Sequence, residues 1–263
     1  MKPLPLLIIN TITFALTLGA NFIAGAGVGE IPSVGEISDQ YPSLLTPAGY
    51  AFSIWGIIYL MLGAFLVYQW VGYAKGNNQE SLLPSGAWFA LSNVFNITWL
   101  LVWVHGYLGL AAVVIALLLF SLIKLVIRLR LEIWDAPLRH IAFVWWPICI
   151  YTGWIVLATV LNISIFLNQF GVLEQVFAEE VWAALIIPIA MGVYLYLTFR
   201  RNMREAALVG VWGLVAVGVN QPSPEGLVAV VAWIAAGVLF LAAGYHGFKN
   251  MGTSPLMKIK KER

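Results

Sequence analysis

Long apolar stretches recur along this chain, and they constrain its fold more than any other feature. A helix that crosses a bilayer needs about 20 consecutive, mostly apolar residues. Because backbone polar groups have no water to bond inside lipid, such stretches fold as helices. The sequence therefore predicts an all-α fold, a polytopic helical membrane bundle of eight helices. These lie near residues 5–28, 50–73, 87–104, 108–128, 140–167, 179–199, 205–220 and 226–247.

The number of charged residues agrees with this prediction. Only 10% of the 263 residues are charged and 61% are hydrophobic, whereas about 25% of residues are charged in soluble domains. The chain is too poor in charge to cover a soluble surface, so we expect an integral membrane protein. Its one cysteine, Cys149, excludes an intrachain disulfide.

The first and seventh stretches are the least regular. Lys2 and the small residues 24–26 flank the first, as in a secretory signal. We favour a retained helix, because Asn10 and Asn21 interrupt the stretch and because it is longer than a typical signal core. The seventh, 206–219, is short and rich in Gly and Val, which is typical of a tilted or broken span.

Basic residues are distributed asymmetrically between the connections. With eight spans, all 14 lysines and arginines fall on one side of the membrane. The charged residues in the connections on the opposite side are all acidic. Lysine and arginine in short loops favour the cytoplasmic side, so both termini are expected to be cytoplasmic. This orientation explains the basic clusters fully, and neither a nucleic-acid partner nor a catalytic role is predicted for them.

An aromatic face opens the second stretch. Phe52, Trp55 and Tyr59 follow the spacing i, i+3, i+7 and so lie on one side of a helix, where Gly56 leaves room beside Trp55. A single ring of this kind usually anchors a helix at the lipid headgroups. Three rings in register also form a wall for a flat ligand, and both interpretations stay open.

Two further helix faces combine amide and indole groups. They are Asn93, Asn96, Trp99 and Trp103 in the third stretch, and Trp154, Ala158, Leu161 and Asn162 in the fifth. Asparagine inside a membrane can join helices by hydrogen bonds of about 1 kcal/mol each. Alternatively, the two faces meet around an aromatic cavity with a few polar groups, which suits a flat, largely apolar ligand.

Residues for acid, base or metal chemistry are sparse within the stretches. No Asp, Glu, Lys or Arg lies near the middle of one, which argues against an ion-coupled pump. His105, His140 and His246 fall near helix ends on different sides, so no metal site is predicted. No nucleophile elbow or phosphate-binding loop is present. We therefore assign no catalytic residue, metal or cofactor, and consider an enzyme the less favoured class.

The connection from Val28 to Thr46 is the longest on the acidic side. It contains Gly, Pro and Ser, but Ile31, Ile37 and Tyr41 make it more apolar than a plain linker. It is either a lid over the mouth of the bundle or a partly ordered loop outside the membrane.

Three blocks of sequence resemble the translocator protein or tryptophan-rich sensory protein (TspO/MBR) family of five-helix membrane proteins. They are PAGYAFSIWGIIY at 47–59, NVFNITW at 93–99 and YTGWIVLATVLN at 151–162. The resemblance covers about residues 1–168. It implies a TspO-like five-helix core there. The remaining apolar stretches predict a three-helix membrane extension with a basic cytoplasmic tail at 169–263, which has no counterpart in the five-helix family.

The resemblance also implies a ligand pocket among the five helices, beneath the connection between the first two. Family ligands include porphyrins and haem-like tetrapyrroles. Carried over, the pocket residues here are Trp55, Asn96, Trp99, Trp154, Ala158 and Leu161, to which Tyr50 and Tyr59 of the aromatic block are added. The leading hypothesis is a sensory or binding protein of the bacterial inner membrane that holds a planar hydrophobic ligand, with a macrocycle placed between Trp55 and Trp154.

Departures from the family pattern restrict the expected ligands, and two other functions stay open. Leu100 and Leu101 replace paired prolines, and 163–167 lacks the sterol-recognition pattern, so cholesterol binding is not implied. The alternatives are a transporter or facilitator of an apolar small molecule, and a porphyrin-modifying enzyme. Small residues at Gly109 and 237–244 are compatible with a homodimer or with packing inside one chain.

Overall fold

The structure is a computed structural model that describes residues 2–25, 32–41, 43–171 and 177–253, and all regular secondary structure in these ranges is helical. The α-helices are α1 (Pro3–Gly25), α2 (Val34–Gln40), α3 (Ile54–Ala74), α4 (Leu82–Ser85), α5 (Trp88–Val104), α6 (Leu108–Arg128), α7 (Leu138–His140), α8 (Trp146–Gln169), α9 (Glu179–Arg201), α10 (Arg204–Val219) and α11 (Leu227–Lys249). The 3₁₀ turns η1 (Gly49–Ser53) and η3 (Met251–Thr253) and the π-helical turn η2 (Ile141–Trp145) complete them.

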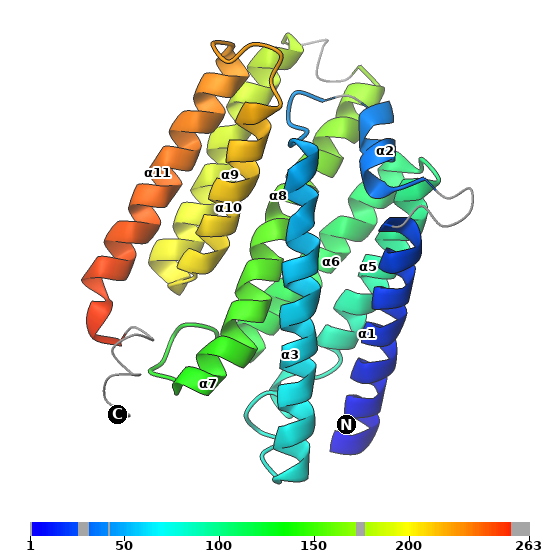
Figure 1. Cartoon of the computed structure of the whole chain (residues 1–263), viewed down its shortest axis with the longest axis vertical. Coiled ribbons are helices and arrows are strands. Elements are labelled where there is room, and N and C mark those ends of the chain that lie inside the picture. The colour runs from blue at the N-terminus through cyan, green and yellow to red at the C-terminus, as the bar shows by residue number, and fades with distance from the viewer. Residues whose placement is uncertain (1, 26–31, 42, 172–176, 254–263) are drawn as a thin grey trace.

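The long helices form the predicted polytopic bundle. Consecutive long helices run in opposite directions, so α1 begins and α11 ends at the same end of the bundle (Figure 1). Among the described residues, six helices are long and apolar enough to cross a membrane. The other two long helices, α5 with 17 residues and α10 with 16, are shorter than a typical span.

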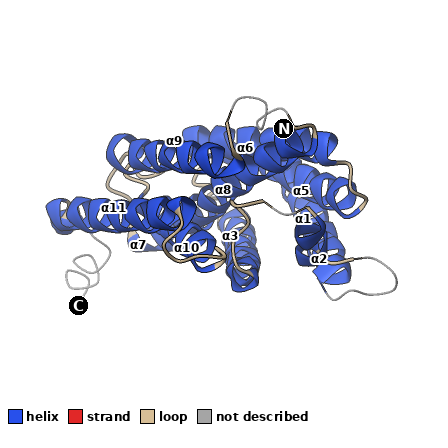
Figure 2. Ribbon diagram, turned by 90° about the horizontal axis from the view of Figure 1, so that it is seen from above, coloured by secondary structure: helices blue, strands red, loops and turns tan. Residues whose placement is uncertain are grey.

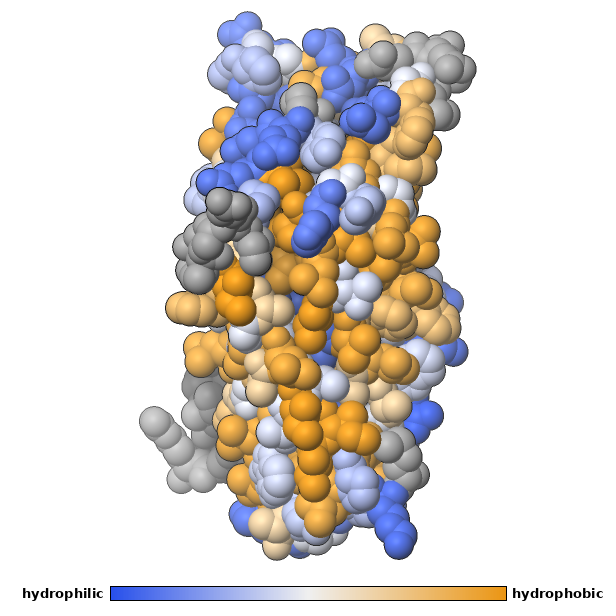
Figure 3. All heavy atoms as spheres, turned by 90° about the vertical axis from the view of Figure 1, so that its right-hand side faces the viewer, coloured by the Kyte–Doolittle hydropathy of each residue, from blue (hydrophilic) through white to orange (hydrophobic). Residues whose placement is uncertain are grey.

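Apolar side chains cover much of the outer surface. Leu60, Ile234 and Phe240 are each more than 60% exposed, and an apolar band separates the more polar ends on the face seen in Figure 3. Soluble proteins rarely expose such large apolar areas. Together with the helix lengths, this surface is that of an integral membrane protein.

The two ends differ in charge as predicted. The helices α3, α6 and α9 end at or beside Lys75, Arg128 and Arg201, and α11 ends at Lys249, all at the end where α1 begins (Figure 1). At the opposite end, α2 contains Glu36, and α9 begins at an acidic pair.

Helix α8 joins the first five long helices to the last three. It packs against α3, α6, α9 and α10 and lies near the centre of the bundle (Figure 2). Glycine allows the closest approach, because a Cβ at Gly153 would lie 2.8 Å from the backbone oxygen of Ala206. The Tyr194 hydroxyl of α9 also donates to the Gly153 carbonyl at 2.7 Å. The last three helices thus share the core of the first five.

Candidate ligand site beneath helix α2

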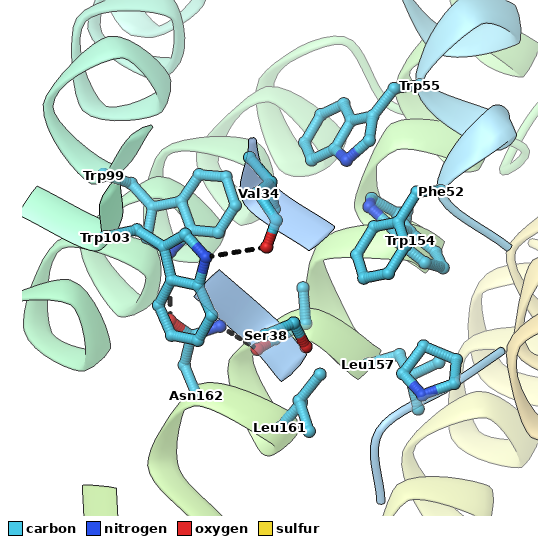
Figure 4. Close-up of a pocket in the computed structure, with 12 residues that line it drawn as sticks. Val34, Ser38, Phe52, Trp55, Trp99, Trp103, Trp154, Leu157, Leu161 and Asn162 are labelled. Atoms are coloured by element: carbon cyan, nitrogen blue, oxygen red, sulfur yellow. Dashed lines mark hydrogen bonds between the residues drawn. The ribbon is translucent and has the colours of Figure 1, made fainter. Parts of the chain in front are cut away.

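A small cavity lies between α3, α5 and α8 and is covered by α2 (Figure 4). Its volume is about 30 Å³. Its lining is Val34, Ser38, Pro47, Phe52, Trp55, Trp99, Trp103, Trp154, Leu157, Ala158, Leu161 and Asn162. As far as the described residues go, this lining contains no charged side chain, so the cavity suits apolar groups.

Four indole rings from three helices form most of the wall. Trp55 stacks on Trp99 with ring centroids 6.3 Å apart and planes at 28°, and Trp99 stacks on Trp103 at 6.1 Å and 21°. Trp154 meets Trp55 edge to face, at 6.3 Å and 84°. Both arrangements are favourable for aromatic pairs.

The predicted placement of a macrocycle between Trp55 and Trp154 does not fit this geometry. Because the edge of one ring contacts the face of the other, there are no two parallel faces between which a flat ligand can stack. The two rings do converge on one chamber, but a ligand has to lie beside the pair, or Trp154 has to rotate.

Polar atoms in the wall fall into two groups. The Trp99 indole N–H donates to Asn162 Oδ1 at 3.0 Å, and the Trp103 indole N–H donates to the Val34 carbonyl at 3.2 Å. By contrast, Trp154 Nε1 and Ser38 Oγ are buried and have no hydrogen-bond partner among the described residues. A buried polar group without a partner costs about 1–3 kcal/mol, so these two atoms mark where a ligand or water can bond.

Helix α2 is a lid with its own stabilising cap. The backbone N–H of Ser33 donates to Glu36 Oε2 at 2.7 Å, and the Glu36 N–H donates to Ser33 Oγ at 3.2 Å. This reciprocal capping box defines the start of the helix. The two hydrogen bonds, first that from the Ser33 backbone, hold the pKa of Glu36 below its usual value. Residues 28–31 and 42 of this connection lie outside the described ranges, and its helical part covers the cavity through Val34 and Ser38, the position that the lid interpretation requires.

The cavity wall that faces α2 is held by α9, α10 and the turn after α10. The segment 44–51 carries Pro47 and leads to Phe52, and five hydrogen bonds tie it to α9, α10 and the turn after α10. These are Leu44 N to Glu179 Oε1 (3.2 Å), Gln221 Nε2 to Leu44 O (2.8 Å), Asn220 Nδ2 to Thr46 O (3.1 Å), Ala48 N to Ala216 O (3.0 Å) and Trp212 Nε1 to Ala51 O (3.1 Å).

Five of the eight predicted site residues lie in the cavity wall: Trp55, Trp99, Trp154, Ala158 and Leu161.

The other three lie elsewhere. Tyr59 is behind the wall and stacks on Trp55 at 5.4 Å. Asn96 is also behind it, where its Nδ2 donates to the Tyr151 hydroxyl at 3.1 Å and its Oδ1 accepts from Asn21 at 2.9 Å. Tyr50 faces away, against Trp212 of α10 at 5.1 Å. Whether these residues bind a ligand stays a prediction.

Seven lining residues are not among the predicted site residues. Four of them lie within the three blocks, and Val34, Ser38 and Trp103 lie outside. Val34 and Ser38 belong to α2, whose start is signalled by the spacing of Ser33 and Glu36. Pro47 is in the first block, but its place in the wall depends on contacts with α10. No local pattern reports such contacts.

The fold and the site define a polytopic helical membrane protein with an internal cavity walled by tryptophan. The family model described as TSPO-like protein matches residues 7–245. The chain therefore belongs to the TSPO-like protein family. The match includes α9, α10 and most of α11, beyond the five-helix part on which the resemblance rested. Comparison with curated proteins and with solved structures gives no match.

Proposed function

We propose that this protein binds a planar, largely apolar ligand of the porphyrin class in the cavity beneath α2, as a binding or sensory protein. The observation that carries the proposal is the convergence of four indoles from α3, α5 and α8 on one uncharged chamber. Trp154 Nε1 and Ser38 Oγ supply the two unused polar atoms there. Aromatic walls with a few polar groups are the usual lining for such ligands.

The size of the cavity requires that the site opens. Cavities for drug-sized ligands occupy about 300–1,000 Å³, whereas this one has about 30 Å³. Helix α2 is the part best able to move, because it has only seven residues and, within the described ranges, one hydrogen bond, from Trp103 to the Val34 carbonyl, joins it to α5. The described state is thus the closed one, and ligand binding displaces α2.

The polar atoms restrict the ligand further. The Trp154 N–H needs an acceptor, and the Ser38 hydroxyl can donate or accept. Because the lining has no charged side chain, a carboxylate on the ligand has to remain at the polar end near α2, where burial costs less. A tetrapyrrole with its acidic groups at one edge meets these conditions.

We also infer that the basic end faces the cytoplasm, with both termini there, in a bacterial inner membrane. The segregation of lysine and arginine supports this orientation. Cysteines introduced at Lys75 and Glu225, at opposite ends, test it, because the native Cys149 is buried. A membrane-impermeant maleimide added outside intact cells should label Glu225→Cys alone, and labelling of Lys75→Cys instead would reverse the orientation.

Titration of the purified full chain with protoporphyrin IX, followed by the shift of its Soret absorption, tests ligand binding. The Trp55→Ala/Trp154→Ala double variant should lose binding. Trp88→Ala is the matched control, since Trp88 lies about 16 Å along α5 from Trp99 and packs on Phe120 instead. Equal affinity in all three proteins would refute the site.

The same protein in liposomes separates the alternative functions. A binding protein should give no net flux of the porphyrin and no new tetrapyrrole species under light and oxygen. Flux would favour the transporter, and turnover that is lost in Trp154→Phe would favour the enzyme.

A further inference from the structure

A second cavity, of about 80 Å³, lies at the basic end of the bundle. It is bounded by the loop after α6, the π-helical turn η2, the start of α10 and the end of α11. In contrast to the aromatic cavity, its lining is largely polar: Glu132, Trp134, Asp135, Ala136, Ile141, Trp145, Asn202, Arg204, His246 and Asn250. Turns of π-helix occur frequently at functional sites.

Three potential metal ligands meet beside this cavity. A carboxylate oxygen of Glu132, a carboxylate oxygen of Glu205 and the Cys149 sulfur all lie within 4.8 Å of one another. They come from the loop after α6, from α10 and from α8, so only the folded bundle brings them together. Glu132 also lines the cavity, so the cluster adjoins open space.

The backbone around the cluster is held in an uncommon conformation. Glu132 and Asn202 have φ angles of 57° and 58°, in the left-handed region that few residues other than glycine adopt. A hydrogen bond of 2.6 Å from Asn202 Nδ2 to the Glu132 carbonyl ties the two together. Conformations of this kind persist where surrounding contacts fix them, and they cluster at ligand sites.

Two atoms of the cluster remain able to bind a metal ion. Arg204 Nε donates to Glu205 Oε1 at 3.3 Å, while Glu205 Oε2 is buried and has no partner among the described residues. The Cys149 side chain is fully buried and forms no disulfide. One carboxylate oxygen and one sulfur are therefore available inside the protein.

Two side chains in the cavity wall point independently to a bound polar species. His246 is 6% exposed and Trp145 is 2% exposed, and both line the cavity. Neither His246 Nδ1 nor Trp145 Nε1 has a hydrogen-bond partner within the described ranges. Water or another small ligand held at a metal ion would satisfy such groups.

We propose that Glu132, Cys149 and Glu205 bind one divalent transition-metal ion of the zinc type, with a fourth position open to the polar cavity. Bonds of about 2.0–2.3 Å in a tetrahedral site place ligand atoms about 3.5 Å apart, so separations of up to 4.8 Å have to close by about 1.3 Å at most. The thiolate favours zinc-type ions over Mg²⁺ or Ca²⁺. Binding releases the thiol proton to solvent through the cavity.

Titration of the purified full chain with Co²⁺ tests the site, because a cobalt–thiolate bond produces a charge-transfer absorption band in the near ultraviolet. One equivalent should generate the band, and Zn²⁺ should abolish it by displacement. Cys149→Ser should lack the band, and Glu205→Gln and Glu132→Gln should weaken Co²⁺ binding at least tenfold. The control is Glu225→Gln, which removes an exposed carboxylate at the other end.

Thermal unfolding gives a second measurement that does not depend on the band. Zn²⁺ in excess should raise the unfolding temperature of the wild type and of Glu225→Gln, since an ion that binds only the folded state stabilises it. It should leave Cys149→Ser unchanged and raise the unfolding temperature of Glu205→Gln less than that of the wild type. A wild type without the thiolate band, or carboxylate variants that bind Co²⁺ as tightly as the control, would overturn the proposal. Neither outcome bears on porphyrin binding.

Discussion

Replacing Trp103 by Phe should loosen the lid over the aromatic cavity. The change removes the 3.2 Å hydrogen bond from the indole to the Val34 carbonyl of α2 and keeps an aromatic ring at this position of α5, beside Trp99. A hydrogen bond of this kind contributes about 1 kcal/mol net, and each 1.36 kcal/mol is a factor of ten in an equilibrium constant. The opening equilibrium of α2 should therefore rise about fivefold.

Amide hydrogen exchange measures this opening directly, without a ligand. The Ile37 amide, which donates to the Ser33 carbonyl at 3.1 Å, and the amides that follow it should exchange about fivefold faster in Trp103→Phe. Trp99→Phe is the matched control, because it makes the same side-chain change but removes a hydrogen bond to Asn162 of α8. Equal acceleration in both variants, or none in Trp103→Phe, would refute the role of this hydrogen bond.

Two further changes test the lid and the support of the cavity. The Ser33 hydrogen bonds hold the pKa of Glu36 below its usual 4.5, so their stabilisation of α2 is present above the unfolded-state pKa and is lost as the pH falls through the folded-state value. Protection of α2 against exchange should decrease in acid, and Glu36→Gln should remove most of that pH dependence; an unchanged dependence would mean that another group causes it. In α10, a Cβ at Gly213 would overlap Leu157 Cδ2, and Leu157 lines the cavity. Gly213→Val should therefore destabilise the protein by about 1–3 kcal/mol and weaken porphyrin binding, as measured by thermal unfolding and Soret titration. Gly237→Val, which meets no atom within 4 Å, should do neither, and equal effects of the two valines would contradict this packing.

Helix positions could be predicted from the sequence because each depends on a local pattern. The apolar stretches near 108–128 and 179–199 agree closely with α6 (Leu108–Arg128) and α9 (Glu179–Arg201). Spacing along a helix also gathers Trp99 and Trp103 on one face of α5, since residues three or four apart lie on one face, but it leaves open whether that face meets α8 around a cavity. What a helix face contacts is set by other helices, and spacing alone does not report it.

The predicted site residues that lie outside the cavity wall show what local sequence patterns cannot predict. Tyr50 lies in the 3₁₀ turn η1, before α3 begins at Ile54, so it does not continue the helical face of Trp55 and meets Trp212 instead. Asn96 was predicted on the correct face, but Tyr151 and Asn21 occupy its amide. It thus serves the joining role that asparagine often has between membrane helices.

The contacts of α9 and α10 give the extension a part in the site. Hydrogen bonds from α9, α10 and the turn after α10 hold the segment that carries Pro47 and leads to Phe52, while Gly213 lets α10 lie against Leu157. One side of the cavity is therefore fixed through several contacts that would all have to break together. The facing side is α2, a seven-residue helix joined to α5 through the Trp103 hydrogen bond and apolar packing. A ligand is expected to enter where the fewest contacts have to break. We therefore expect α2 to move and the wall held by the extension to stay in place.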